Sequence, residues 1–125
     1  MSELPDAPAA VVQRQLDAYN AHDLEALLAV YAPDAALYEH PDVLLARGTA
    51  ELRTRFAVRL AEPNLRADLR HRAVCGAMVV DHEWVSRMFP EGPGTLELVM
   101  IYEVRAGRIA RAWSLVGEKR LAAPA

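Results

Sequence analysis

The spacing of apolar residues changes near residue 65, and this change limits the folds that the chain can adopt. Before that point apolar residues recur every three or four positions, as on one face of a helix. After it they alternate with polar residues, as in strands, over roughly residues 65–75, 78–89, 95–105 and 108–117. The segments "CGA" and "RAG" predict tight turns, and "PEGPG" predicts a longer hairpin loop. Helices followed by long antiparallel strands predict an α+β domain.

Two helices are predicted before residue 33. The first covers residues 7–23, where the apolar face carries Val12, Leu16 and Tyr19, and Asp6 followed by Pro8 indicates its start. The second covers residues 24–32, and the Asp23 carboxylate can cap it. Its buried side is expected to carry Leu24, Leu27, Leu28 and Tyr31, and Pro33 with Asp34 to end it.

A short strand and a third helix are predicted next. Residues 35–41 have the length of a short strand, which Pro41 ends. The helix covers residues 47–64; Thr49 is its predicted cap, and its apolar stripe consists of Leu52, Phe56 and Leu60. Its other face carries Arg53, Arg55 and Arg59, and such a run of charge usually forms a solvated face.

Composition narrows the classes of function. The 125 residues fit one domain, 1–125, with flexible ends expected at 1–7 and 121–125. The net charge of −3 argues against nucleic acid as a partner. Cys75 is the only cysteine, so neither a disulfide within the chain nor a Cys-rich zinc site is expected. The start of the sequence lacks a signal-peptide pattern, and no apolar run is long enough for a membrane span, so we expect a cytoplasmic protein with no membrane partner.

Four stretches carry a resemblance to a known family: "VVQRQLDAYNAHDLEALLAVYAPDA", "RGTAELR", "RAVCGAMVV" and "AGRIARAWSLVGEKR". Together they resemble the nuclear transport factor 2-like superfamily, in its ketosteroid-isomerase and SnoaL-like branch. The resemblance implies a cone, in which a curved sheet and three helices enclose an apolar pocket. It also implies a homodimer that pairs through the outer sheet face. Members include isomerases, polyketide cyclases, dehydratases, epoxide hydrolases, ligand carriers and association modules, so the fold alone does not fix a reaction.

The stretch "VVDHEWV", residues 79–85, contains three consecutive residues that can ligate a metal or move a proton. Successive side chains of a strand point to opposite faces, so Asp81 and Glu83 share one face and His82 takes the other. The triplet therefore cannot chelate a metal by itself, and no metal site is expected. Both faces mix polar and apolar residues, so alternation does not choose between them. The resemblance places His82 and Trp84 in the pocket, together with Val80 and Ser86, and turns Asp81 and Glu83 outward.

The last two strands have clearer faces. The apolar face of residues 95–105 is expected to point inward and carries Leu96, Leu98, Met100, Tyr102 and Val104. For the final strand the resemblance places Ala110, Ala112, Ser114 and Val116 inward, and small side chains there leave room for a ligand. Trp113, Ile109 and Leu115 are then expected on the outer face, where they offer an apolar surface to a second copy.

The isomerases of this family carry a catalytic carboxylate just before a proline, at the end of the short strand. In "YEHP" the residue before proline is His40, with Tyr38 on the same side, and a shift of one residue would select Glu39 instead. We favour His40, because the proline anchors the alignment and an imidazole can act as acid or base near neutral pH. The isomerases also use a tyrosine and a protonated aspartic acid as oxyanion donors. Gln15 and Met100 (or Val99) stand at those positions, so steroid isomerisation is not expected.

These considerations define a predicted site. The predicted catalytic residues are His40, His82 and Tyr38. The predicted pocket residues are Gln15, Tyr19, Phe56, Trp84, Met100, Tyr102, Ala112, Ser114 and Val116. His82 can instead be a core histidine with one hydrogen bond, and Tyr19 can be plain helix core. The predicted function is acid–base catalysis of the isomerase, lyase or cyclase kind on a small apolar molecule, without a cofactor. The alternatives are binding of such a molecule without reaction, and a dimerising association domain.

Overall fold

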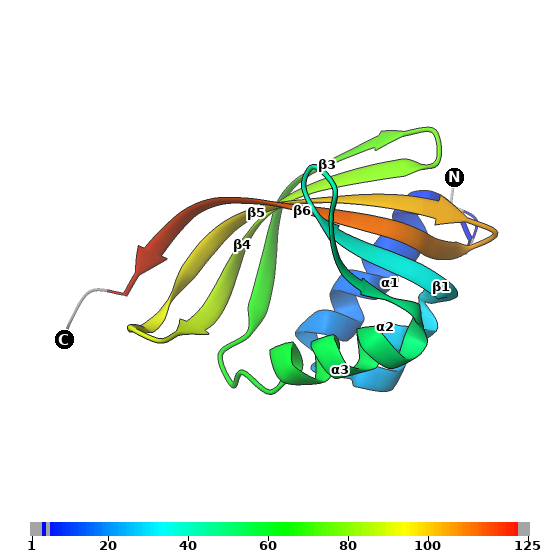
Figure 1. The fold of residues 1–125 in the computed structure, drawn as a ribbon. Helices are drawn as coiled ribbons and strands as arrows, with labels where there is room; N and C mark the ends of the chain where they lie inside the picture. Colours follow the sequence, from blue (N-terminus) through cyan, green and yellow to red (C-terminus); the bar gives the residue numbers. More distant parts are fainter. Residues whose placement is uncertain (1–3, 5, 123–125) are drawn as a thin grey trace.

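Three helices and six strands make up the computed structural model, which describes residue 4 and residues 6–122 (Figure 1). The elements are α1 Pro8–Asn20, α2 Leu24–Ala29, β1 Tyr31–Glu39, β2 Val43–Arg47, α3 Gly48–Leu60, β3 Arg66–Cys75, β4 Met78–Phe89, β5 Gly92–Arg105 and β6 Arg108–Leu121. The strands form one sheet in the order β2-β1-β6-β5-β4-β3. Among the strand pairs of the described residues, only β1–β6 is parallel. The predicted α+β class is confirmed.

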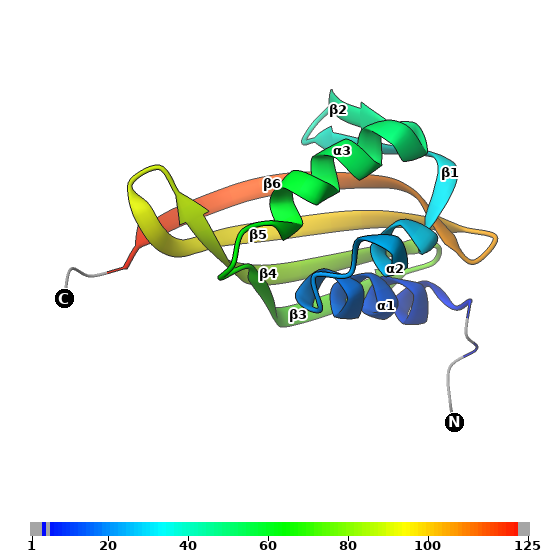
Figure 2. The same ribbon diagram turned by 90° about the horizontal axis from the view of Figure 1, so that it is seen from below.

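All three helices lie against one face of the sheet, which we call the inner face; the opposite, outer face carries no helix (Figures 1 and 2). The long strands β3 to β6 curve across the helices. The core lies between the two layers and includes Val11, Leu27, Leu52, Val79 and Ile109, each almost fully buried. Within the described residues no helix is long and apolar enough to cross a bilayer.

The predicted starts and ends of α1 and α2 are partly right. Pro8 lies in the first turn of α1, but no side chain caps that helix, and Ala7 rather than Asp6 precedes it. The Asp23 carboxylate accepts a hydrogen bond from the Ala26 N–H at 3.1 Å, as expected for a cap. The prediction that α2 runs to residue 32 is wrong. Tyr31 is buried, but it pairs with Ile109 as the first residue of β1, because sheet pairing overrides helix propensity there.

The chain between α1 and α2 is held to distant segments by its side chains. The Asn20 amide donates to the Ala67 carbonyl and accepts from the Ala67 N–H, at 3.0 and 2.8 Å, as a neighbouring strand would. The His22 ring nitrogens lie 3.0 Å from the Leu60 carbonyl oxygen and 2.8 Å from that of Leu65. These contacts join α1 to the end of α3 and the start of β3, and they give a physical reason for the motif "NAHDL".

The predicted apolar stripe of α3 is confirmed, since Leu52, Phe56 and Leu60 are buried. Thr49 does not cap the helix, because its hydroxyl turns back to the Pro33 carbonyl. Glu51 instead accepts a hydrogen bond from the Arg47 N–H at 2.9 Å, which satisfies one donor at the start of the helix. Gly48 opens α3 with a φ of +83°, a conformation that side chains disfavour.

The four long strands are found where alternation predicted them, with tight turns at "CGA" and "RAG". Three details differ. The strand β2 was not predicted, and β5 begins at Gly92, which pairs with Phe89, so "PEGPG" is a tight hairpin rather than a long loop. Gly94 is required there, because a Cβ would lie 2.4 Å from the Arg120 carbonyl oxygen. The strand β6 reaches Leu121, where a flexible end was predicted. Residues 1–3, 5 and 123–125 of the predicted flexible ends lie outside the described residues.

Candidate functional site

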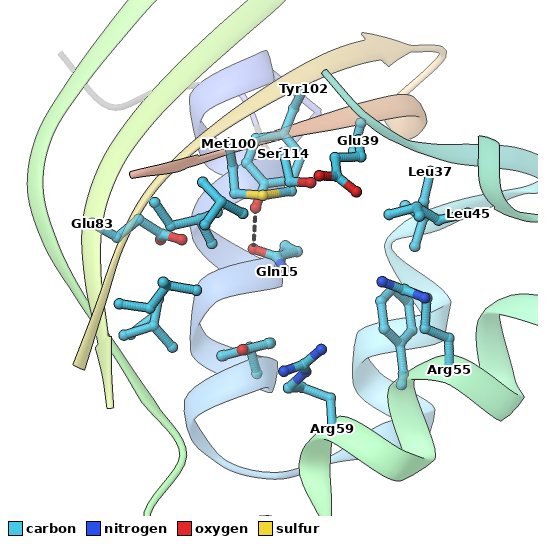
Figure 3. A pocket seen from close by; sticks show the side chains of 18 of the residues that line it. Gln15, Leu37, Glu39, Leu45, Arg55, Arg59, Glu83, Met100, Tyr102 and Ser114 are labelled. Carbon is cyan, nitrogen blue, oxygen red and sulfur yellow. Dashed lines mark hydrogen bonds between the residues drawn. The ribbon is translucent and has the colours of Figure 1, made fainter. Parts of the chain in front are cut away.

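A cavity of about 230 Å³ lies between the inner face of the sheet, α1 and α3 (Figure 3). Its apolar lining comes from two helices and four strands and includes Leu16, Leu37, Leu45, Phe56, Val85, Leu96, Leu98 and Met100. Its polar lining consists of Gln15, Tyr19, Tyr31, Tyr38, Tyr102 and Ser114. Its charged lining consists of Glu39, Arg55, Arg59, Glu83 and Arg87. The cavity is therefore largely apolar, and its charged residues come from β1, α3 and β4.

The structure brings most of the predicted pocket residues together at this cavity. The predicted residues that line it are Gln15, Tyr19, Tyr38, Phe56, Met100, Tyr102, Ala112, Ser114 and Val116. The predicted inner face of β5 is right, and the apolar pattern of that strand was sufficient to find it. The face predicted for β6 is right for Ser114 but wrong for Ile109. A register shift at Glu103 and Val104 turns Ile109 into the core, where it is fully buried.

The orientation predicted for β4 is wrong. Its inner face carries Val79, Asp81, Glu83 and Val85, all of them buried. His82 and Trp84 therefore lie on the outer face and do not line the cavity. The His82 Nε2 lies 2.9 Å from the Glu97 carboxylate, and the Arg120 guanidinium stacks 4.5 Å from the Trp84 ring centre. The family resemblance chose the wrong set of alternating residues, because the hydrophobic pattern itself favoured neither.

His40 does not line the cavity either. Its side chain is exposed beyond the end of β1, and its backbone N–H donates to the Ser114 carbonyl at 2.7 Å. The neighbouring residue, Glu39, lines the cavity, so the alternative that a one-residue shift would select is the one placed there. A register shift between Leu37 and Tyr38 interrupts the β1–β2 pairing. That irregularity explains why Leu37, Tyr38 and Glu39 all reach the cavity instead of alternating.

Three buried tyrosines and one glutamine form the inner part of the polar lining. The Tyr102 hydroxyl donates to Gln15 Oε1 at 3.1 Å (Figure 3). Burial raises the pKa of Tyr102, Tyr31 and Tyr19 well above the ordinary range of a phenol, and for Tyr31 a hydrogen bond from Gln15 opposes this. All three hydroxyls therefore stay protonated at any physiological pH, and they can act as hydrogen-bond donors.

Glu83 differs from the other charged residues of the cavity in being buried without a partner among the described residues. Its residue is only 4% exposed, and within the described part of the chain no hydrogen bond or ion pair holds its carboxylate. Burial raises its pKa to about 7; the negative charge of Asp81 adds to this rise, and the Arg72 guanidinium opposes it. Figure 3 shows the side chain reaching from β4 toward the cavity. Such a carboxyl group can both take and return a proton near neutral pH.

Asp81, two residues earlier on the same face, is fully buried but paired. Its two carboxylate oxygens accept hydrogen bonds from Arg72 at 2.7 and 2.9 Å. The same guanidinium donates to Gln13 Oε1 at 2.9 Å, so the pair is tied to α1. The two acids of "VVDHEWV" thus differ in kind, since Asp81 is fixed by a partner and Glu83 is not.

The sequence predicted that the arginines of α3 form one solvated face, and the structure confirms this only in part. Arg53 follows that expectation, because it forms an exposed ion pair with Glu25. Arg55 is exposed as predicted and Arg59 is half-buried, but both of them also line the cavity. No group of three or more His, Cys, Asp or Glu side chains that could hold a metal is found in residue 4 and residues 6–122.

Comparison with known proteins agrees with this architecture. The sequence matches the SnoaL-like domain family over residues 12–112. No curated protein matches it.

Several solved structures are similar to the chain. A candidate polyketide cyclase from Sinorhizobium meliloti has a TM-score of 0.70 and 28% identity, over 89% of this chain and 94% of that one. An LEH-like epoxide hydrolase from M. tuberculosis has a TM-score of 0.77 and 16% identity, over 93% and 86%. A protein of unknown function from Mesorhizobium loti, described as NTF2-like, has a TM-score of 0.76 and 20% identity, over 94% and 98%. The chain therefore belongs to the SnoaL-like domain family and has the cone fold of NTF2-like proteins.

Proposed function

We propose that this protein is an enzyme that binds a small, largely apolar molecule in the cavity and moves a proton on it, with Glu83 as the acid–base group. The observation that carries the proposal is the position of Glu83. It is a buried carboxyl group without a partner among the described residues, its pKa is raised to about 7, and it lies on the wall of a largely apolar cavity. General bases and acids work best when their pKa lies near the working pH.

The residues around Glu83 suit removal of a proton from a carbon atom next to a carbonyl group. The carboxylate takes the proton, and negative charge moves to the carbonyl oxygen of the substrate. The Tyr31 hydroxyl accepts a hydrogen bond from Gln15, and its own proton can be donated to that oxygen. Donors placed where charge develops stabilise the transition state more strongly in a site with little water. Glu83 can then return the proton to another atom, which gives an isomerisation, an elimination or a ring closure.

The size of the cavity limits the substrate. Its volume of about 230 Å³ is below the roughly 300–1,000 Å³ of common ligand sites, so one substituted ring is a suitable size. The similar solved structures support a small-molecule enzyme in general terms, since they include a candidate polyketide cyclase and an epoxide hydrolase. Their low identity supports the fold rather than any one of these reactions.

The test is deuterium incorporation in D₂O, followed by proton NMR, with a panel of cyclic ketones and 1,3-diketones as probes. The wild-type protein should exchange the proton next to the carbonyl of at least one probe faster than buffer does. Glu83→Gln should lower that rate by about 10²–10⁴-fold, as expected on loss of a general base. His82→Gln is the matched control, because it changes the next residue on the opposite face of β4 and should exchange at the wild-type rate. An unchanged rate in Glu83→Gln would remove the assignment, and a probe that binds without exchange would favour simple ligand binding.

Self-association through the outer face is a second candidate role. Two apolar rows cross that face, one with Val80, Ile101 and Trp113, the other with Val99 and Leu115. Leu115 is 45% exposed, and no helix covers these rows. Analytical ultracentrifugation at micromolar concentration should find a dimer that Leu115→Arg converts to a monomer. A wild-type monomer at that concentration would contradict this role.

A further inference from the structure

The α3 side of the cavity carries two arginines whose positive charges the described residues neutralise only in part, and we propose that they bind an anionic group of the ligand, a carboxylate. The proposal rests on the cavity being the ligand site, as above, and it adds the chemical class of the substrate: a small ring that bears a carboxylate. It does not depend on the role of Glu83. The two residues are Arg55 and Arg59, one helical turn apart, so both reach the same side of α3.

Arg55 has no protein partner in the described part of the chain. No hydrogen bond or ion pair involves its guanidinium group there, although the opposite charge of Glu39 acts on it from a distance. Burial and the neighbouring charge of Arg59 lower the pKa of Arg55. Arg55 is still exposed to solvent and Arg59 is half-buried, so the shift indicates that two positive charges lie close together at the edge of the cavity lining.

Arg59 is also incompletely satisfied. Its Nη1 atom is buried and has no hydrogen-bond acceptor among the described residues, and the nearest carboxylate oxygen, on Glu62, lies 3.6 Å away. Glu62 is already engaged. It accepts two hydrogen bonds from Arg87 at 2.8 and 3.0 Å, and one from the Met88 N–H at 2.9 Å. Glu62 therefore hydrogen-bonds to Arg87 and forms only a looser ion pair with the buried Arg59 Nη1. The Arg59 side chain is 29% exposed, and no hydrogen bond within the described residues uses its other N–H groups, so a ligand can bind these.

The charges of the cavity wall favour an anion. Of the three arginines that line the cavity, Arg87 is paired, and Glu39 is the carboxylate that acts on Arg55. A guanidinium group presents parallel N–H donors that match the two oxygens of a carboxylate. Guanidinium N–H groups that have no acceptor on the protein can gain one from a bound carboxylate. Arg53 on the same helix shows the contrast, because Glu25 already satisfies it.

The position of the two arginines also orients the ligand. Figure 3 shows Arg55 and Arg59 reaching into the cavity from α3, whereas Glu83 reaches in from β4 on the opposite side. A second, open groove of about 570 Å³ runs between β2 and α3 and shares Leu45, Arg55 and Arg59 with the cavity. A carboxylate held by the arginines thus lies toward this groove, and the apolar ring of the ligand points toward Glu83.

The experiment compares benzoate with benzamide, which have nearly the same shape but differ in charge, by isothermal titration calorimetry and proton–nitrogen NMR. The wild-type protein should bind benzoate about 10- to 100-fold more tightly than benzamide, as expected for charge-assisted hydrogen bonds. Arg59→Gln and Arg55→Gln should each reduce this preference by about tenfold or more. Arg53→Gln is the matched control from the same helix, and it should keep the wild-type preference.

Several results would overturn the proposal. These are equal binding of the two probes, an equal loss in Arg53→Gln, or no binding of benzoate, cyclohexanecarboxylate or 2-naphthoate at millimolar concentration. Arg59→Lys keeps the charge but loses the paired donors, so it should recover only part of the preference, and its thermal unfolding shows whether the fold is intact. Benzoate has no proton next to a ketone, so its binding reports on the arginines alone. A preserved carboxylate preference together with unchanged exchange in Glu83→Gln would contradict the proposed catalysis but leave this inference standing.

Discussion

Asp81 and Glu83 lie two residues apart on the same face of the same strand, both buried, and yet they are held in opposite ways. Asp81 faces solid protein, and Arg72 binds both of its oxygens. Glu83 faces the cavity, and no described residue hydrogen-bonds or pairs with its carboxylate. Burial alone therefore does not identify a reactive acid. A buried carboxylate with a dedicated cation is a structural element, whereas one without a partner beside open space can exchange a proton with a ligand.

The largest expected effect on stability comes from removing the Asp81 carboxylate, which is the paired acid of the two. Asp81→Ala leaves the Arg72 guanidinium with the half-buried Gln13 as its one hydrogen-bond acceptor among the described residues, and it should lower the free energy of unfolding by about 3–5 kcal/mol. Urea denaturation measures this loss. The double variant Asp81→Leu with Arg72→Met removes both charges and should recover much of the stability. A single variant with wild-type stability would contradict the structural role.

Glu83→Gln should raise the free energy of unfolding instead of lowering it, and only at high pH. Between pH 4.5 and about 7 the unfolded chain loses the Glu83 proton while the folded protein keeps it, so wild-type stability falls as pH rises through this window. The cost reaches about 3 kcal/mol above pH 7, and glutamine does not incur it. The variant should gain up to that amount relative to wild type between pH 4 and pH 8.5, as measured by denaturation at both values. Equal pH profiles for the two proteins would show that Glu83 is not buried as described.

Tyr102→Phe tests whether the polar wall of the cavity depends on its hydrogen bonds. The substitution leaves Gln15 Oε1 without its donor in a buried place, which should cost about 1–3 kcal/mol. Tyr38→Phe is a suitable control, because the Tyr38 hydroxyl accepts its hydrogen bond from Arg47 on the exposed side. Chemical denaturation should rank the two variants in that order, and equal losses would argue against a special role for the Tyr102–Gln15 bond.

The smallest effect is expected from His82, which lies between the two acids in sequence but on the other face of the sheet. His82→Ala removes a half-exposed contact with Glu97, so the unfolding midpoint should stay within about 2 °C of wild type. Differential scanning calorimetry is sensitive enough to decide this. A much larger loss would mean that the outer face is covered in solution, as self-association would require.

The general fold could be predicted from the sequence because its signals agree with one another. The switch from helical spacing to alternation located the helices and the four long strands, and the motif "NAHDL" with its Asp23 cap located the junction of α1 and α2. The end of α2 and the strand β2 could not be predicted in this way. Both depend on pairing with segments far away in sequence, as Tyr31 does with Ile109.

The candidate site was only partly predictable, and its charged residues were missed. The apolar side of β5 was clear, because its two faces differ in polarity. The faces of β4 do not differ in that respect, and buried carboxylates are uncommon, so nothing in the pattern turned Glu83 inward. Arg55 and Arg59 were missed because a run of arginines on a helix is usually solvated. Their spacing around the buried Phe56 was the signal that could have placed them near the cavity.

The parallel pairing of β1 with β6 has a consequence for how the site forms. Tyr38 aligns with Trp113, so one wall of the cavity joins segments from the first third and the end of the chain. Contacts between such distant segments form slowly, because the intervening chain must be ordered first. During synthesis on the ribosome, helices α1 to α3 emerge long before β6 does. The cavity is therefore completed last, and a nascent chain that lacks β6 already contains Glu83, Arg55 and Arg59 but has no enclosed place in which they can act together.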